Sequence, residues 1–137
     1  MISRVSSFKL SPGPDQIFKE LAVKDLYLLQ IKNESKTVEG RINKGIVKEL
    51  QEGDIIRLFS NSSNERYVKC RLTEVKTFST FRDMLDYFGL CHCLPEAINI
   101  QEGVEIYRNF PGYSEQESIY GVKGFRIQIL SENISNI

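Results

Sequence analysis

The segment Lys36-Thr37-Val38-Glu39-Gly40-Arg41-Ile42 is the most informative stretch of the chain. Its side chains alternate, which places Thr37, Glu39 and Arg41 on one face and Lys36, Val38, Gly40 and Ile42 on the other. A period of two residues predicts a β-strand. A strand that only fills a core would carry fewer polar side chains, so this strand is also the first candidate for a site.

Lys36 and Arg41 bracket Glu39, and the set has two interpretations. Glu39 and Arg41 share a face and could form a surface ion pair, worth under about 1 kcal/mol. A lysine partly removed from water beside a carboxylate and a guanidinium could instead serve as a base or nucleophile. The spacing alone favours the surface ion pair.

The neighbouring segments predict a mixed α+β chain in which strands and short helices follow one another. Strands are expected over 17–23, 55–59, 67–75 and 122–130, and helices over 25–32, over 81–88 and in a region from Leu94-Pro95 to Phe110. Ser79 or Thr80 is expected to cap the second helix and Gly89 to end it. Ser114 to Glu117 is typical of a capping box.

Length and composition predict one globular domain. The chain has 137 residues, and its 18 Lys and Arg balance 18 Asp and Glu. Segment 24–48 nevertheless holds six basic residues against three acidic ones. The neutral total argues against a clamp that grips nucleic acid by bulk charge, but it permits a small basic cleft. We expect an irregular arm over 1–15, the domain over 16–131 and a polar tail over 132–137.

Three cysteines give no disulfide framework, and neither a secretory segment nor a membrane span is recognisable. An intracellular, reducing location, cytoplasmic or nuclear, is therefore expected. Cys91-His92-Cys93 places three soft donors in a row, but a tetrahedral zinc site needs spaced pairs that converge. We expect buried thiols and a loop histidine, with no metal and no cofactor.

Five segments together resemble one known family. They are Ile31–Arg41, Glu52–Ile56, Phe78–Leu85, Ile106–Arg108 and Tyr120–Phe125. In this order they are similar to the ASCH domain (activating signal cointegrator homology) of the PUA-like superfamily, over residues 17–130. Glu34 stands where the family usually has glycine, and Cys91–Gln101 is an insert.

The resemblance implies a small PUA-like mixed β-barrel with flanking helices and a cleft lined by the strand 36–41. It also implies binding of RNA or a nucleotide-like ligand. The ligand-binding residues would be Lys36, Thr37, Glu39, Arg41, Lys69, Arg71, Tyr107 and Tyr113, with the tyrosines stacking on bases.

Two alternatives accompany the binding function. Some family members resemble hydrolases of N4-acetylcytidine, and others resemble ribonucleases. In either case Lys36 would be the base or nucleophile and Glu39 its partner, although those amidohydrolases have threonine where this chain has Glu39. The second alternative is a scaffold that meets protein partners through the barrel surface.

Overall fold

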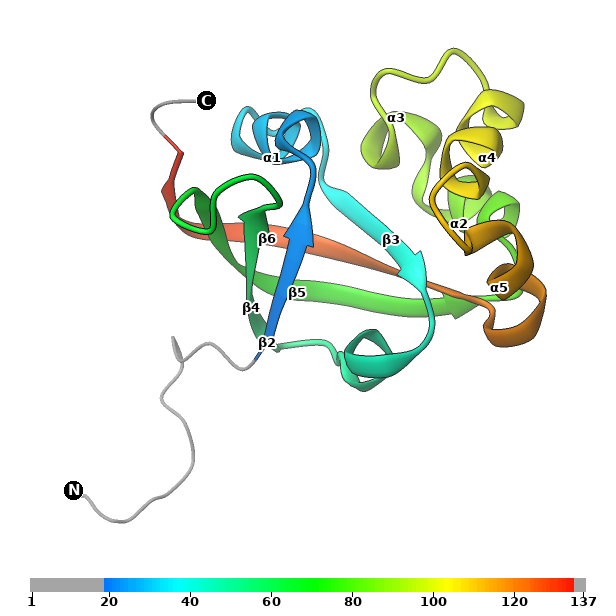
Figure 1. The fold of residues 1–137 in the computed structure, drawn as a ribbon, viewed down its shortest axis with the longest axis horizontal. Coiled ribbons are helices and arrows are strands. Elements are labelled where there is room, and N and C mark those ends of the chain that lie inside the picture. The colour runs from blue at the N-terminus through cyan, green and yellow to red at the C-terminus, as the bar shows by residue number, and fades with distance from the viewer. Residues whose placement is uncertain (1–18, 135–137) are drawn as a thin grey trace.

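A computed structural model describes residues 19–134 of the chain, which form one mixed sheet with helices around it (Figure 1). The strands are β2 (Lys19–Val23), β3 (Val38–Ile42), β4 (Ile55–Ser60), β5 (Tyr67–Phe78) and β6 (Val122–Asn133). The helices are α1 (Asp25–Lys32), α2 (Phe81–Phe88), α3 (Leu90–Cys93), α4 (Ile100–Arg108) and α5 (Tyr113–Tyr120), with a 3₁₀ turn η1 (Gly45–Glu49). The α+β class expected from the sequence is confirmed.

The sheet has the order β2-β4-β5-β6-β3, in which only the β2–β4 pair is parallel. Among the described strands β2 and β3 are therefore the two edges, and the sheet is open. The closed barrel expected from the resemblance is not confirmed. The two edges are nevertheless linked, because Arg41 Nη2 on β3 donates a hydrogen bond to the Ala22 carbonyl on β2 (2.7 Å).

The apolar side chains form two clusters. The first packs β2, β4, β5 and β6 against α1 and contains Leu28, Leu58 and Phe125. The second packs β3 and the start of β6 against α2 and α4 and contains Val38, Phe81 and Tyr107. Figure 1 shows α2 to α5 gathered at one end of the molecule, away from α1 and β4. Strand β3 lies between this helical end and β2.

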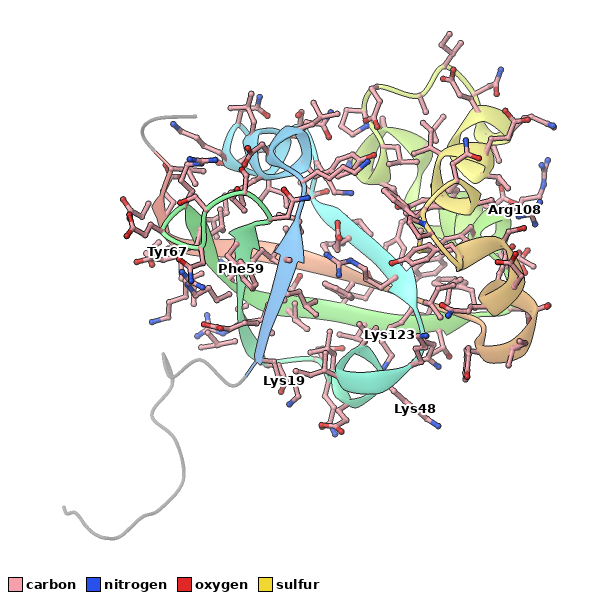
Figure 2. All side chains as sticks on the ribbon, in the orientation of Figure 1. Lys19, Lys48, Phe59, Tyr67, Arg108 and Lys123 are labelled. Carbon is pink, nitrogen blue, oxygen red and sulfur yellow. The ribbon has the colours of Figure 1, made fainter. Side chains whose placement is uncertain are left out.

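A buried lysine of β6 contacts the end of η1. Lys123 on β6 is buried, and its Nζ donates to the carbonyls of Lys48 (2.8 Å) and Leu50 (3.2 Å). Figure 2 shows Lys123 and Lys48 near each other at this end of the sheet. Burial lowers the pKa of Lys123 below its usual range. These contacts satisfy carbonyls at the end of a short 3₁₀ turn, which has few internal hydrogen bonds.

Several boundaries differ from the sequence-based expectation. The strand expected from Lys36 begins at Val38, and the helix expected from Leu94 begins only at Ile100. Strand β6 continues to Asn133, into the segment expected to be tail, while the arm over 1–15 lies outside the described residues. The cause is long pairing between β5 and β6, which extends both strands beyond their apolar alternation.

The capping box expected at Ser114 is wrong. Helix α5 already begins at Tyr113, its N-cap position is the left-handed Gly112, and no side chain caps it. The backbone at Glu34 has the left-handed conformation that glycine commonly adopts in turns, with φ 65°. Glutamate therefore occupies a left-handed position that the family usually gives to glycine.

Candidate functional site

A pocket of about 280 Å³ opens between the two sheet edges. Strands β2 and β3 form two of its sides, and α1, the end of α4, the start of α5 and several connecting segments supply the rest. Its lining residues are Ala22, Val23, Lys24, Tyr27, Lys36, Glu39, Gly40, Arg41, Asn61, Leu94, Tyr107, Phe110, Pro111 and Tyr113. The pocket thus joins segments that are far apart in the sequence.

Glu39 is held between two cations in the pocket. Its Oε1 lies 3.3 Å from Lys36 Nζ, and its Oε2 lies 2.7 Å from Arg41 Nε. The side chains of Lys36, Glu39 and Arg41 are 2%, 8% and 18% exposed. The surface ion pair favoured by the spacing is therefore wrong, because packing against α1 and the helical end buries the pair.

Burial and charge act on Glu39 in opposite directions. Removal from water raises the pKa of Glu39, but the nearby Arg41 and Lys36 charges outweigh it and hold the pKa below the usual range. The same pairing raises the pKa of Arg41 although burial opposes it. Glu39 is thus an ionised acceptor at neutral pH.

Lys36 uses its ammonium group inside the protein. Besides Glu39, its Nζ donates to the carbonyls of Val38 (2.9 Å) and Cys93 (2.5 Å). The ammonium also lies 5.2 Å from the centre of the Tyr27 ring. The three N–H groups of Lys36 thus have three acceptors inside the protein, and none is left for a substrate. This geometry is that of a structural and electrostatic cation.

Aromatic rings form the walls of the pocket. Tyr27 and Tyr107 are buried, whereas Phe110 and Tyr113 are half-buried. Lys24 stands at the rim with its Nζ 4.9 Å from the centre of the Phe110 ring. Burial raises the pKa of all three tyrosines, which therefore present neutral hydroxyl groups. With Lys24, Lys36 and Arg41 against Glu39 alone, the lining carries a net charge of +2.

The structure brings five of the eight expected binding residues into this pocket, namely Lys36, Glu39, Arg41, Tyr107 and Tyr113. Tyr107 lies in the core, with its ring stacked on Phe81 at 4.3 Å between centres. Its position at the pocket floor leaves Tyr113 as the more exposed of the two tyrosines expected to stack.

The other three expected residues lie elsewhere. Thr37 donates its backbone N–H to the His92 carbonyl (2.9 Å) and does not line the pocket. Lys69 and Arg71 lie on β5 opposite Arg57 and Ile55 of β4, away from β3. They form no continuous basic track with the pocket, because β4 and β6 separate β5 from both edge strands.

Sequence reasoning missed Lys24, Tyr27 and Phe110. Tyr27 follows the apolar pattern of α1, so the sequence does not distinguish it from a core residue. Phe110 gives one local signal, since it is an aromatic residue directly before Pro111-Gly112, where a loop is expected.

The Cys91–Gln101 insert forms α3 and the approach to α4. Cys93 is buried, and burial raises its pKa to about 11, whereas Cys91 is exposed. Within residues 19–134 no three His, Cys, Asp or Glu side chains are grouped as metal ligands. The insert contributes to the pocket through Leu94 and through the Cys93 carbonyl that receives Lys36.

None of the helices in residues 19–134 has the length and apolar character that crossing a membrane requires.

Comparison with solved structures gives several similar folds. The hypothetical protein PH0355 superposes with a TM-score of 0.71 at 28% identity, covering 82% of this chain and 98% of that one. Protein PF0455 from Pyrococcus furiosus gives 0.65 at 28% identity, covering 85% and 99%. The ASCH protein from Zymomonas mobilis gives 0.56 at 11% identity, covering 86% and 74%, which shows a shared fold.

Comparison with curated proteins gives no significant match. The model of the ASCH domain, however, matches residues 21–130, which include every residue that lines the pocket. This match covers most of the chain and agrees with the fold shared with the Zymomonas mobilis protein. The chain therefore belongs to the ASCH domain family.

Proposed function

We propose that this ASCH domain binds single-stranded RNA or a nucleotide-like ligand in the pocket between β2 and β3. The observation that carries the proposal is the combination of aromatic walls with a net charge of +2 in one pocket. Unpaired RNA is commonly recognised by stacking of its bases on aromatic rings and by cationic contacts to its phosphates. Both kinds of group are present here within a single cavity.

The size of the pocket restricts the ligand. Small-molecule sites typically measure roughly 300–1,000 Å³, and this pocket of about 280 Å³ lies at the lower limit. It accommodates one base or one nucleotide and leaves the remainder of a strand outside. Lys24 at the rim and the partly exposed Arg41 are the cations available to a phosphate.

The hydrolase alternative has less support from the geometry. An attacking lysine needs a free amine directed at the substrate, whereas all three hydrogens of Lys36 Nζ meet acceptors within the protein. We therefore rank binding before catalysis. Turnover of N4-acetylcytidine or of RNA by the purified protein, abolished by Lys36→Ala, would reverse that order.

The experiment is a binding titration with fluorescent RNA hexamers of adenosine, cytidine, uridine, or alternating guanosine and uridine. Anisotropy is measured over a range of salt concentrations. With one to three phosphate contacts, the logarithm of the binding constant should fall against that of the salt concentration with a slope between about −0.7 and −2. Absence of binding to every hexamer at low salt would refute the proposal.

The variant Lys24→Ala tests the location of the site. Lys24 lies at the pocket rim and is exposed, so its removal should weaken RNA binding several-fold and make the salt slope shallower by about 0.7. The matched control is Lys48→Ala on η1, an exposed lysine that does not line the pocket. Equal losses in both variants would indicate non-specific attraction and contradict a pocket site.

A further inference from the structure

The edge of β3 at Gly40 carries an unusual set of backbone groups. Ile127 N donates to Thr37 O (2.9 Å), and Asn43 N donates to Gly121 O (3.0 Å). In an antiparallel pair every second residue bonds to the partner strand and the residues between them point to the opposite edge. Because the register between β3 and β6 has no shift, Val38, Gly40 and Ile42 direct their backbone groups away from β6.

The neighbours of Gly40 on this edge have partners. The Val38 carbonyl accepts from Lys36 Nζ, and the Ile42 carbonyl accepts from Lys44 N (2.9 Å). The outward N–H and C=O of Gly40 have no hydrogen-bond partner within the part of the chain that the structure describes. Gly40 is buried and lines the pocket, so these two groups lie side by side at its wall.

The hydroxyl of Tyr107 is a third buried polar group at the same point. This hydroxyl has no partner among residues 19–134, and it belongs to Tyr107, which lines the pocket and is only 3% exposed. A Cβ added at Gly40 would lie 3.1 Å from this oxygen. Stacking of the Tyr107 ring on Phe81, with an angle of 4° between planes, fixes the position of the hydroxyl.

Buried donors and acceptors without partners are rare in folded proteins, because each one costs roughly 1–3 kcal/mol. Three such groups meeting at one pocket indicate that the partner is the ligand. Deepening the function proposed above, and resting on it, we propose that the Gly40 N–H, the Gly40 C=O and the Tyr107 hydroxyl read the Watson–Crick edge of a single RNA base.

The chemistry of a base fits this set. A strand residue facing outward offers one donor and one acceptor side by side, and each RNA base has an adjacent donor and acceptor on its Watson–Crick edge. A flat ring held there would lie among the aromatic walls of the pocket, with its phosphate toward Lys24 at the rim. The base would be read without displacing the Lys36–Glu39–Arg41 cluster.

The first test uses the same RNA hexamers with their bases methylated on the ring nitrogen of the Watson–Crick edge. The methyl group blocks the contact to Gly40, so affinity should fall about tenfold or more for the hexamer that binds best. The matched control is methylation at a ring carbon away from this edge. It keeps the hydrogen-bonding groups, and its affinity should change less than about threefold.

The second test removes one oxygen. Tyr107→Phe should weaken binding of the unmodified hexamer roughly threefold to tenfold, as loss of one hydrogen bond does. The thermal midpoint should stay equal or rise, because the lost hydroxyl has no partner within residues 19–134. Tyr120→Phe on α5, half exposed and outside the pocket, is the matched control and should leave affinity unchanged.

A third measurement needs no substitution. In the free protein the Gly40 amide should exchange with solvent faster than those of Glu39 and Arg41, which bond to β6. Saturating RNA should slow Gly40 exchange selectively.

The outcomes separate the two proposals. This inference would be overturned, and the proposed function left intact, by one combined result. RNA would bind equally well after edge methylation and to the Tyr107→Phe variant, and it would not slow exchange of the Gly40 amide. Failure of every hexamer to bind would overturn both.

Discussion

Glu39 illustrates how single residues act in this protein. Its carboxylate is nearly buried, yet it carries charge because Lys36 and Arg41 contact both of its oxygens. Removing one member of such a buried set leaves the others without a counter-charge, which is far more costly than breaking an exposed pair. Stability and the electrostatics of the pocket therefore depend on the same three side chains.

At this scale we predict that Glu39→Gln lowers the free energy of unfolding by about 3 kcal/mol, since the buried Lys36 and the partly buried Arg41 lose their anion. Urea denaturation at neutral pH measures the change. The matched control is Glu20→Gln, because Glu20 is 54% exposed and lies 3.4 Å from Arg57. That substitution should cost under about 1 kcal/mol. A similar small loss in both variants would show that Glu39 is not buried between Lys36 and Arg41.

At the scale of an element, hydrogen bonds to its first turn stabilise the N-terminus of helix α2. Thr80 Oγ1 accepts a hydrogen bond from Asp83 N (3.1 Å), and the buried Glu117 on α5 accepts one from Phe81 N (2.8 Å). Arg108 Nε on α4 donates to the other oxygen of Glu117 (2.8 Å). One carboxylate thus links α2, α4 and α5, three of the four helices at the end of the molecule where Figure 2 labels Arg108.

At the scale of this element, Thr80→Ala should lower the free energy of unfolding by about 1 kcal/mol, because it removes a helix cap. Thermal or urea unfolding followed by circular dichroism measures it. Ser79→Ala is the control: Ser79 is exposed and is not the N-cap of α2. A change within about 0.5 kcal/mol is expected there. The reverse ranking would mean that the helix starts one residue earlier.

The element boundaries also show how far local pattern reaches. Helices α1 and α2 have the bounds expected from the sequence, because the apolar spacing of both helices and the Thr80 cap of α2 are local signals. The start of α4 was missed although Asn99 is followed three residues later by Glu102, a pattern typical of a helix start, because the apolar residues from Leu94 onward suggested an earlier beginning. Asn99 Oδ1 accepts from Glu102 N (2.8 Å), and this cap sets the boundary.

Across the whole molecule, the candidate site lies where the two edges of the described sheet approach each other. Edge strands β2 and β3 come together at Arg41 and Ala22 without pairing along their backbones. A site at unpaired edges can use backbone groups as well as side chains, which is the role that we propose for Gly40. The lining of the pocket between these edges carries a net positive charge, although the total charge of the chain is zero.

Acid stability is a property of the whole molecule that follows from two carboxylates. The pKa of Glu39 lies below its usual 4.5, and hydrogen bonds from Ser60 and Ser62 and contact with Arg66 lower the pKa of Asp25 below 3.8. A lowered pKa favours the folded state above the unfolded value and loses that contribution as pH falls. The free energy of unfolding should therefore decline below about pH 4.5, measured by urea denaturation at stepped pH.

Glu39→Gln should flatten this acid dependence relative to the unsubstituted protein, because it removes one of the two titrating groups. An unfolding free energy that rises between pH 5 and pH 3 would contradict the prediction.

Periodicity, helix caps and the order of motifs are local features of the chain. They were enough to predict the α+β class, the ASCH family, most strands and helices, and a candidate site at Lys36, Glu39 and Arg41. Folding brings these three side chains together, with Lys36 and Glu39 buried and Arg41 partly exposed. It also leaves Thr37, Lys69 and Arg71 outside the pocket and places Tyr107 at its floor. Alternation places Lys36 and Glu39 on opposite faces, yet Lys36 precedes the strand and its long side chain reaches Glu39. Burial and convergence depend on packing between distant segments, and no local pattern in the chain encodes which edges will meet.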